Sequence, residues 1–170
     1  MKKFNSLNAV ISFFYGFYLV MIVLSVLEVS KIILNFDFKT TIKINDVEFI
    51  PNDFMSKSLV ILVLISNIIF VYSIYLFKKT TSFFKKKDVF NNEVIHNLKK
   101  IGQLILISSL IKGVPLFLFY TFHISKQYVS HKHSFLNLDF PLVCLAVFFM
   151  VLAEVFSMGK QLKEENDLMI

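Results

Sequence analysis

The amino-acid sequence predicts an all-α integral membrane protein with four transmembrane helices, and three observations support this prediction. First, 56% of the 170 residues are hydrophobic and the mean hydropathy is +0.68, whereas soluble domains are about 45–50% apolar. Second, the chain contains four apolar runs near the length of about 20 residues that a spanning helix needs. Third, the 18 basic residues are all lysines, and most lie between these runs.

The four apolar runs define the expected spans. They are Asn8–Leu34, Ser58–Phe77, Ile101–Phe122 and Phe140–Met158. Met1-Lys2-Lys3 before the first run is also typical of a secretory signal, but the run is too long and lacks a small-x-small cleavage site. We therefore expect a retained first helix, with cleavage as the alternative.

The distribution of lysines predicts the orientation. Eleven lysines precede the first span, fill the loop Lys78–Lys100 or follow the last span, whereas five lie in the other two loops. Positive charge is retained on the cytoplasmic side of a membrane. Both termini and the middle loop are therefore expected in the cytoplasm, in a multi-pass protein of a bacterial inner membrane.

The first outer loop, Asn35–Lys57, carries a strand pattern. Apolar and polar residues alternate in Thr41–Ile44 and in Val47–Ile50, on either side of Asn45-Asp46. Two short alternating runs across a two-residue turn predict a small extracytoplasmic β-hairpin. Because two strands alone are barely stable in water, we expect the hairpin to lie on the helix ends or on the lipid surface.

The middle loop combines aromatic and cationic residues. Phe83-Phe84 is followed by Lys85, Lys86 and Lys87, a pattern typical of contact with anionic lipid headgroups. A short cytoplasmic interfacial helix is then expected before Lys99-Lys100, because four residues recur at helical spacing: Phe90, Val94, Asn97 and Leu98. The alternative is a basic loop that only sets topology.

Four charged residues fall within the expected spans, where charges are rare and often functional. Glu28 and Lys31 are one turn apart in the first span, so they can pair with each other. Lys112 lies near the middle of the third span and Glu154 near the cytoplasmic end of the fourth. We expect Glu154 to be the partner of Lys112, if the third and fourth helices are antiparallel neighbours.

Three interpretations of such a pair remain open: a buried ion pair that fixes helix register, a site for proton or ion transfer, or side chains that reach a water-filled crevice. Gly113 and Pro115 follow Lys112 directly, so a kink is expected beside the charge. Four helices leave little room for a transport path, and a pore would need an oligomer.

The motifs of catalysis and cofactor binding are missing from the sequence. It has no Gly-rich phosphate loop, no Gly-x-Ser-x-Gly elbow and no His-Glu-x-x-His pair. We expect no enzyme, no cofactor and no metal site, since His123, His131 and His133 lack a completing ligand set. Cys144 is single, which excludes an intramolecular disulfide, and the absence of Arg disfavours direct nucleic-acid recognition.

The C-terminal residues form a distinctive tail at 159–170. Charged residues follow Gly159 at once, and the chain ends on apolar residues after an acidic run, a pattern that favours docking into a partner groove. The expected partner-binding residues are Leu162, Glu164, Glu165, Asp167, Leu168 and Ile170.

The tail resembles a family of bacterial membrane proteins grouped as domain of unknown function 2975. The resemblance rests on Phe156-Ser157-Met158-Gly159, then Leu162-Lys163-Glu164-Glu165, then Asp167-Leu168-Met169-Ile170, where Met169 stands in place of the family's usual Thr. A second match is Phe90 with Leu98-Lys99-Lys100-Ile101-Gly102. The four-span layout extends the resemblance over essentially the whole chain.

The resemblance implies a membrane protein whose relatives are often encoded beside a small helix-turn-helix regulator. We therefore expect a non-enzymatic protein that binds or sequesters such a cytoplasmic DNA-binding partner through its tail and basic loop, with membrane lipids and a second copy as further partners. The alternative is a small oligomeric transporter or channel-like protein that uses Lys112 and Glu154.

Overall fold

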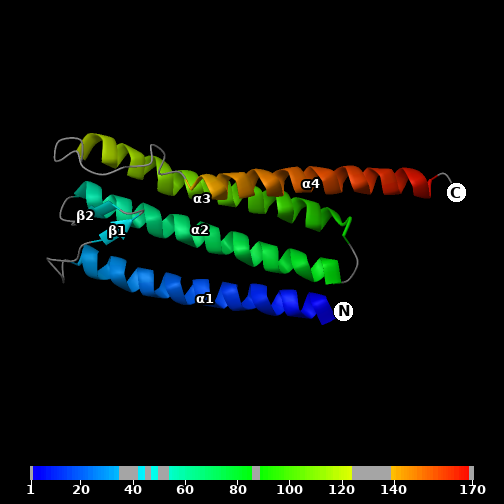
Figure 1. Cartoon of the computed structure of the whole chain (residues 1–170), viewed down its shortest axis with the longest axis horizontal. Helices are drawn as coiled ribbons and strands as arrows, with labels where there is room; N and C mark the ends of the chain where they lie inside the picture. The colour runs from blue at the N-terminus through cyan, green and yellow to red at the C-terminus, as the bar shows by residue number, and fades with distance from the viewer. Residues whose placement is uncertain are drawn as a thin grey trace.

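The structure, a computed structural model, describes residues 2–34, 42–44, 47–49, 54–85, 89–123 and 139–168. These residues contain four long helices, and each is long and apolar enough to cross a membrane. The helices are α1 (Lys2–Ile33), α2 (Phe54–Lys85), α3 (Asn92–His123) and α4 (Phe140–Asp167) (Figure 1). Both termini lie at the same end of the molecule, here called the terminal end.

Two three-residue strands lie between α1 and α2. β1 (Ile42–Ile44) pairs antiparallel with β2 (Val47–Phe49), with Ile42 opposite Phe49. The expected turn residues Asn45 and Asp46 lie outside the described residues. The four long helices make the fold class all-α, and the position of the strand pair on the outer surface stays a prediction.

The helices form an open row in which neighbours in sequence are neighbours in space. Extensive contacts join α1 to α2, α2 to α3 and α3 to α4, and α1 and α4 lie on opposite sides of α2 (Figure 1). Large apolar side chains cover the outside of the row, such as Phe13 at 71% exposure and Val23 at 60%. Exposed apolar surface on this scale requires lipid as the solvent.

A close approach between two helices joins α3 to α4. A Cβ atom added at Gly102 would lie 2.6 Å from the backbone oxygen of Ala146 and 2.6 Å from Cγ of Met150. Small residues permit such contact between helix backbones in a membrane. One end of the same interface buries Val94, Leu98 and Ala153 in a single cluster.

The interface between α2 and α3 contains a buried interhelical hydrogen bond, which the Ser66 hydroxyl donates to the backbone oxygen of Ser108 at 2.8 Å. Such a bond satisfies a polar side chain in an apolar solvent. The interface between α1 and α2 is less extensive. It includes a hydrogen bond that the Thr81 hydroxyl donates to Asn8 Oδ1 at 2.7 Å near the terminal end. Toward the opposite end, Val29 and Ile32 pack on Val60.

The segment before Lys99-Lys100 is helical, as predicted, but the prediction that it is a short interfacial helix of its own is wrong. Residues 92–100 are the first turns of α3, which continues to His123 in one helix. The apolar residues Val94, Leu98, Ile101 and Ile105 are all buried, and their spacing of three or four residues keeps one face turned toward the protein. Because nothing interrupts that spacing, the segment packs on α4 instead of lying on the membrane surface.

Replacing Gly102 with Ala should destabilise the fold, because the new methyl group meets backbone atoms of α4 that cannot rotate away. Overpacking of this kind costs about 1–3 kcal/mol. Gly16→Ala is the matched control, since no atom lies within 4 Å of its added Cβ. Unfolding titrations in detergent should show lower stability for Gly102→Ala alone; equal stability of the two variants would contradict the close approach.

Candidate functional site

An aromatic junction at the terminal end joins the start of α3 to α4. It consists of Phe84, Phe90, Phe156 and Gly159. The rings of Phe84 and Phe90 each contact Phe156 edge to face, with centroids 6.1 Å apart in both pairs. Phe90 also lies so close to Gly159 that an added Cβ would be 2.6 Å from its Cε1 atom. The two segments that carry the family resemblance therefore contact each other here.

Polar contacts surround this junction. Lys160 Nζ donates to Asn92 Oδ1 at 2.7 Å, which ties α4 to the first residue of α3. Lys79 on α2 pairs with Glu93 on α3 at 2.6 Å. Both pairs are partly exposed, so each contributes little stability. Together with the ring contacts, they hold α4 in one direction where it leaves the other helices.

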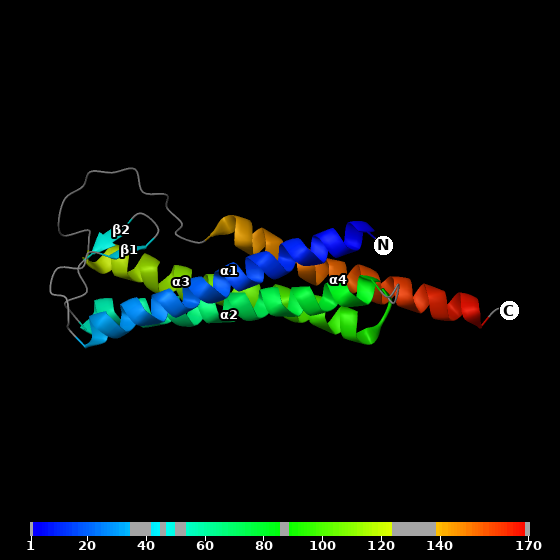
Figure 2. The same cartoon turned by 90° about the horizontal axis from the view of Figure 1, so that it is seen from below.

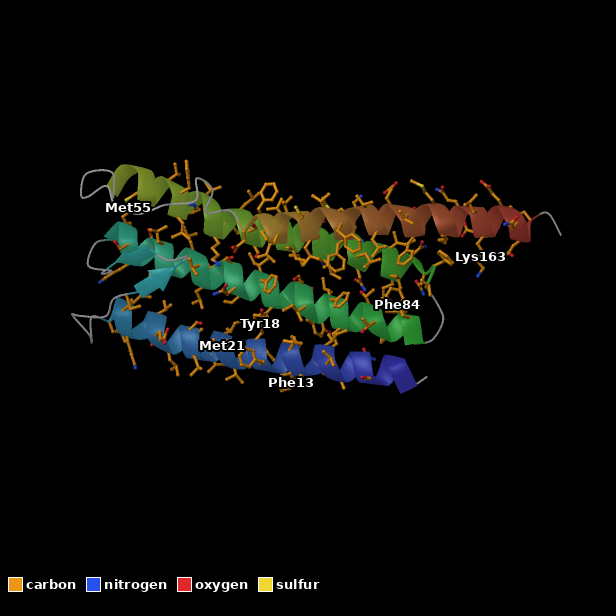
Figure 3. All side chains as sticks on the ribbon, in the orientation of Figure 1. Phe13, Tyr18, Met21, Met55, Phe84 and Lys163 are labelled. Carbon is orange, nitrogen blue, oxygen red and sulfur yellow. The ribbon has the colours of Figure 1, made fainter. Side chains whose placement is uncertain are left out.

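Beyond the junction, the end of α4 forms a helix exposed on all sides, here called the tail helix (Gln161–Leu168). Every one of its residues is exposed, with Leu162 at 61% and Leu168 at 87%. The tail helix projects past the ends of the other three helices (Figure 1), and Lys163 lies on this projecting part (Figure 3).

The expected partner-binding residues of the tail differ in their ion pairs and neighbours. Glu164 pairs with Lys160 one turn earlier at 3.3 Å, whereas Glu165 and Asp167 have no ion-pair partner among the described residues. Leu162 continues an exposed apolar line on α4 that includes Val155 and Met158. The C-terminal Ile170 lies outside the described residues.

Most of the lysines predicted to contact lipid headgroups lie in a part of the middle loop outside the described residues. Lys86 and Lys87 lie outside the described residues, and Lys85 is described only as the last residue of α2. His131 and His133 also lie outside them. Among the residues that the structure describes, no three His, Cys, Asp or Glu side chains come together as metal ligands.

A second polar feature lies in the half of the molecule opposite the terminal end. Lys112 Nζ contacts Asp139 Oδ2 at 3.3 Å, and the two side chains are 25% and 39% exposed. Asp139 is the N-cap residue of α4, yet its side chain makes no capping hydrogen bond. Its carboxylate is turned to the neighbouring helix instead, where it neutralises Lys112.

The prediction that Glu154 is the partner of Lys112 is therefore wrong. Ala153 packs with Val94 and Leu98, which places Glu154 about level with Val94. At roughly 1.5 Å per residue, Lys112 lies about 27 Å farther along α3. Glu154 is exposed on the outer side of α4, so these two residues do not form a shared transport site.

Asp139 lies directly before the fourth apolar run, so the apolar run alone does not single it out. A local signal was present: Asp139 is followed by Pro141 in the first turn, and Asp before an early Pro is typical of a helix start. Glu28 and Lys31 are both exposed on α1. No ion pair joins them among the described side chains.

A groove of about 230 Å³ lies between α1 and α2 and is lined mainly by apolar side chains. Tyr18 and Met21 line its α1 side (Figure 3). Its polar residues are Ser25 and Asn67, besides the Tyr18 hydroxyl. The Ser25 hydroxyl donates to the backbone oxygen of Met21 at 2.8 Å. The groove therefore offers no paired acid and base.

These features define a multi-pass membrane protein built from four apolar helices. The family described as Protein of unknown function (DUF2975) matches residues 6–170, nearly the whole chain. The chain belongs to this family, as the resemblance of its tail predicted. Comparison with curated proteins and with solved structures finds no match.

The contact between Lys112 and Asp139 predicts energetic coupling. In a double-mutant cycle, Lys112→Met and Asp139→Asn should each lower the free energy of unfolding. The double variant should lose less than the sum of the two single losses. We expect a coupling energy of about 0.5–1 kcal/mol from unfolding titrations in detergent, because the pair is partly exposed.

The matched control is the cycle of Lys112→Met with Glu154→Gln. These residues are far apart, so their effects should add within about 0.5 kcal/mol. Coupling of Lys112 to Glu154 and not to Asp139 would contradict the register of α3 and α4.

Proposed function

We propose that this chain is a non-enzymatic inner-membrane protein of bacteria that binds or sequesters a cytoplasmic partner through its tail helix and basic loop. A small helix-turn-helix transcriptional regulator is the proposed kind of partner. The observation that carries the proposal is the tail helix itself, which projects beyond the other helices and is exposed along its whole length.

The apolar residues of α4 near its end support a helix-docking mode of recognition. Met158, at the end of the predicted span, and Leu162, one turn beyond it, are 54% and 61% exposed, and their spacing of four residues places them on one helix face. An amphipathic partner can bury such a line, as in other helix-mediated complexes. Leu162 lies beyond the predicted end of the span at Met158 and among charged residues.

Charge on the same end favours a basic partner. Glu165 follows Leu162 by one turn and has no ion-pair partner in the described part of the chain. An unpaired carboxylate beside an apolar anchor can pair with a lysine or arginine of a DNA-binding protein, which gives specificity and faster association. Sequestration follows if the bound surface is also the one that the regulator uses for DNA.

The first test is capture of a purified helix-turn-helix regulator by the full chain in mild detergent, compared with a chain that lacks Gln161–Ile170. Leu162→Asp should lower capture at least tenfold, because it places a charge in the proposed apolar anchor. Glu165→Gln should weaken capture, and its neighbour Glu164→Gln is the matched control, since that carboxylate already pairs with Lys160.

Equal capture by the intact and shortened chains would reject the proposal. The proposal would also be rejected if Glu164→Gln weakened capture more than Leu162→Asp. Intact membrane insertion and an unchanged helical circular-dichroism spectrum must accompany any loss, because a misfolded tail would also fail to bind.

A further inference from the structure

Three tyrosines and two lysines form a continuous series across α1, α2 and α3, here called the tyrosine–lysine belt. Lys78 Nζ lies 5.4 Å from the ring centroid of Tyr15, and Lys100 Nζ lies 6.0 Å from that of Tyr72. Tyr75 lies between them, with its ring centroid 6.1 Å from both Tyr15 and Tyr72. The belt therefore joins side chains from three helices into one surface.

Within the described part of the chain, the lysines of the belt carry charge that no carboxylate neutralises. Lys78 and Lys100 are half-buried, and no carboxylate among the described residues pairs with either. The nearby carboxylate of Glu93 is already bound to Lys79. Contact with an aromatic ring holds an ammonium group in place but supplies no negative charge.

Asn97 adds a further donor on the same side of α3. It lies four residues after Glu93 and three before Lys100, so it shares the face that these two residues present to α2. Its side chain is buried, and its Nδ2 atom has no hydrogen-bond acceptor in the described part of the molecule. The amide of Asn97 is therefore a buried hydrogen-bond donor beside the belt without an acceptor among the described residues.

The position of the belt matches a membrane boundary. The span predicted in α2 ends at Phe77, next to Lys78, and the span predicted in α3 begins at Ile101, next to Lys100. Tyrosine is enriched at membrane interfaces because its ring is apolar and its hydroxyl is polar. Tyr72 and Tyr75 are each 45% exposed, so a molecule in the surrounding bilayer can reach them.

We propose that the tyrosine–lysine belt binds the phosphate of an anionic phospholipid headgroup. Lys78 and Lys100 supply the charge, the tyrosine hydroxyls donate hydrogen bonds, and the acyl chains lie along the exposed apolar faces of the helices. This site is distinct from the lysines of the middle loop and does not depend on the proposed partner of the tail helix.

Native mass spectrometry of the full chain, delipidated and then titrated with phosphatidylglycerol or phosphatidylcholine, tests the proposal. We expect retention of phosphatidylglycerol and at least tenfold weaker retention of phosphatidylcholine. The double variant Lys78→Gln/Lys100→Gln should lose at least tenfold in retention of phosphatidylglycerol. Tyr72→Phe, which removes only a hydroxyl, should lose less.

Lys99→Gln is the matched control, because Lys99 is exposed and adjacent to Lys100 but is not part of the belt. It should retain phosphatidylglycerol like the unaltered chain. An equal loss in this control would overturn the proposal, because it would show general attraction by positive charge. Millimolar inorganic phosphate should not displace the lipid, and displacement would overturn the assignment to a lipid headgroup.

Discussion

The contact of Gly102 with the backbone of α4 sets the register on which the rest of α3 and α4 depends. Only hydrogen fits at this position, since a Cβ would lie 2.6 Å from the Ala146 oxygen. The helices are antiparallel, so each step along α3 corresponds to a step back along α4. A single close approach therefore determines which side chains meet at both ends of the interface.

Both polar ends of the interface follow from this register. Toward the N-terminus of α4, the register brings Asp139 to Lys112, which leaves no unpaired charge at that position. Toward the terminal end, it brings Gly159 beneath the ring of Phe90 and Lys160 to Asn92. The second contact bears on the proposed function, because it lies where the tail helix leaves the row.

The helices themselves were predictable from apolar length, which is a local property of the chain. Their contacts were not, because pairing depends on register. The prediction for Lys112 shows this: Glu154 is the more conspicuous carboxylate within an apolar run, but it lies about 27 Å away along the helix axis. The tyrosine–lysine belt was equally hidden, since Tyr15, Tyr72 and Lys100 are far apart in sequence and meet only when three helices pack.

The residues that carry the family resemblance divide into two physical roles. Phe90, Gly102 and Gly159 make close contacts between α3 and α4 that larger or smaller side chains could not make, so packing alone accounts for their identity. Packing does not account for Leu162 or Glu165, because both side chains are exposed. An exposed motif that packing does not explain fits the proposed interaction with a partner, and the contacts of Gly159 with Phe90 lie at the base of that motif.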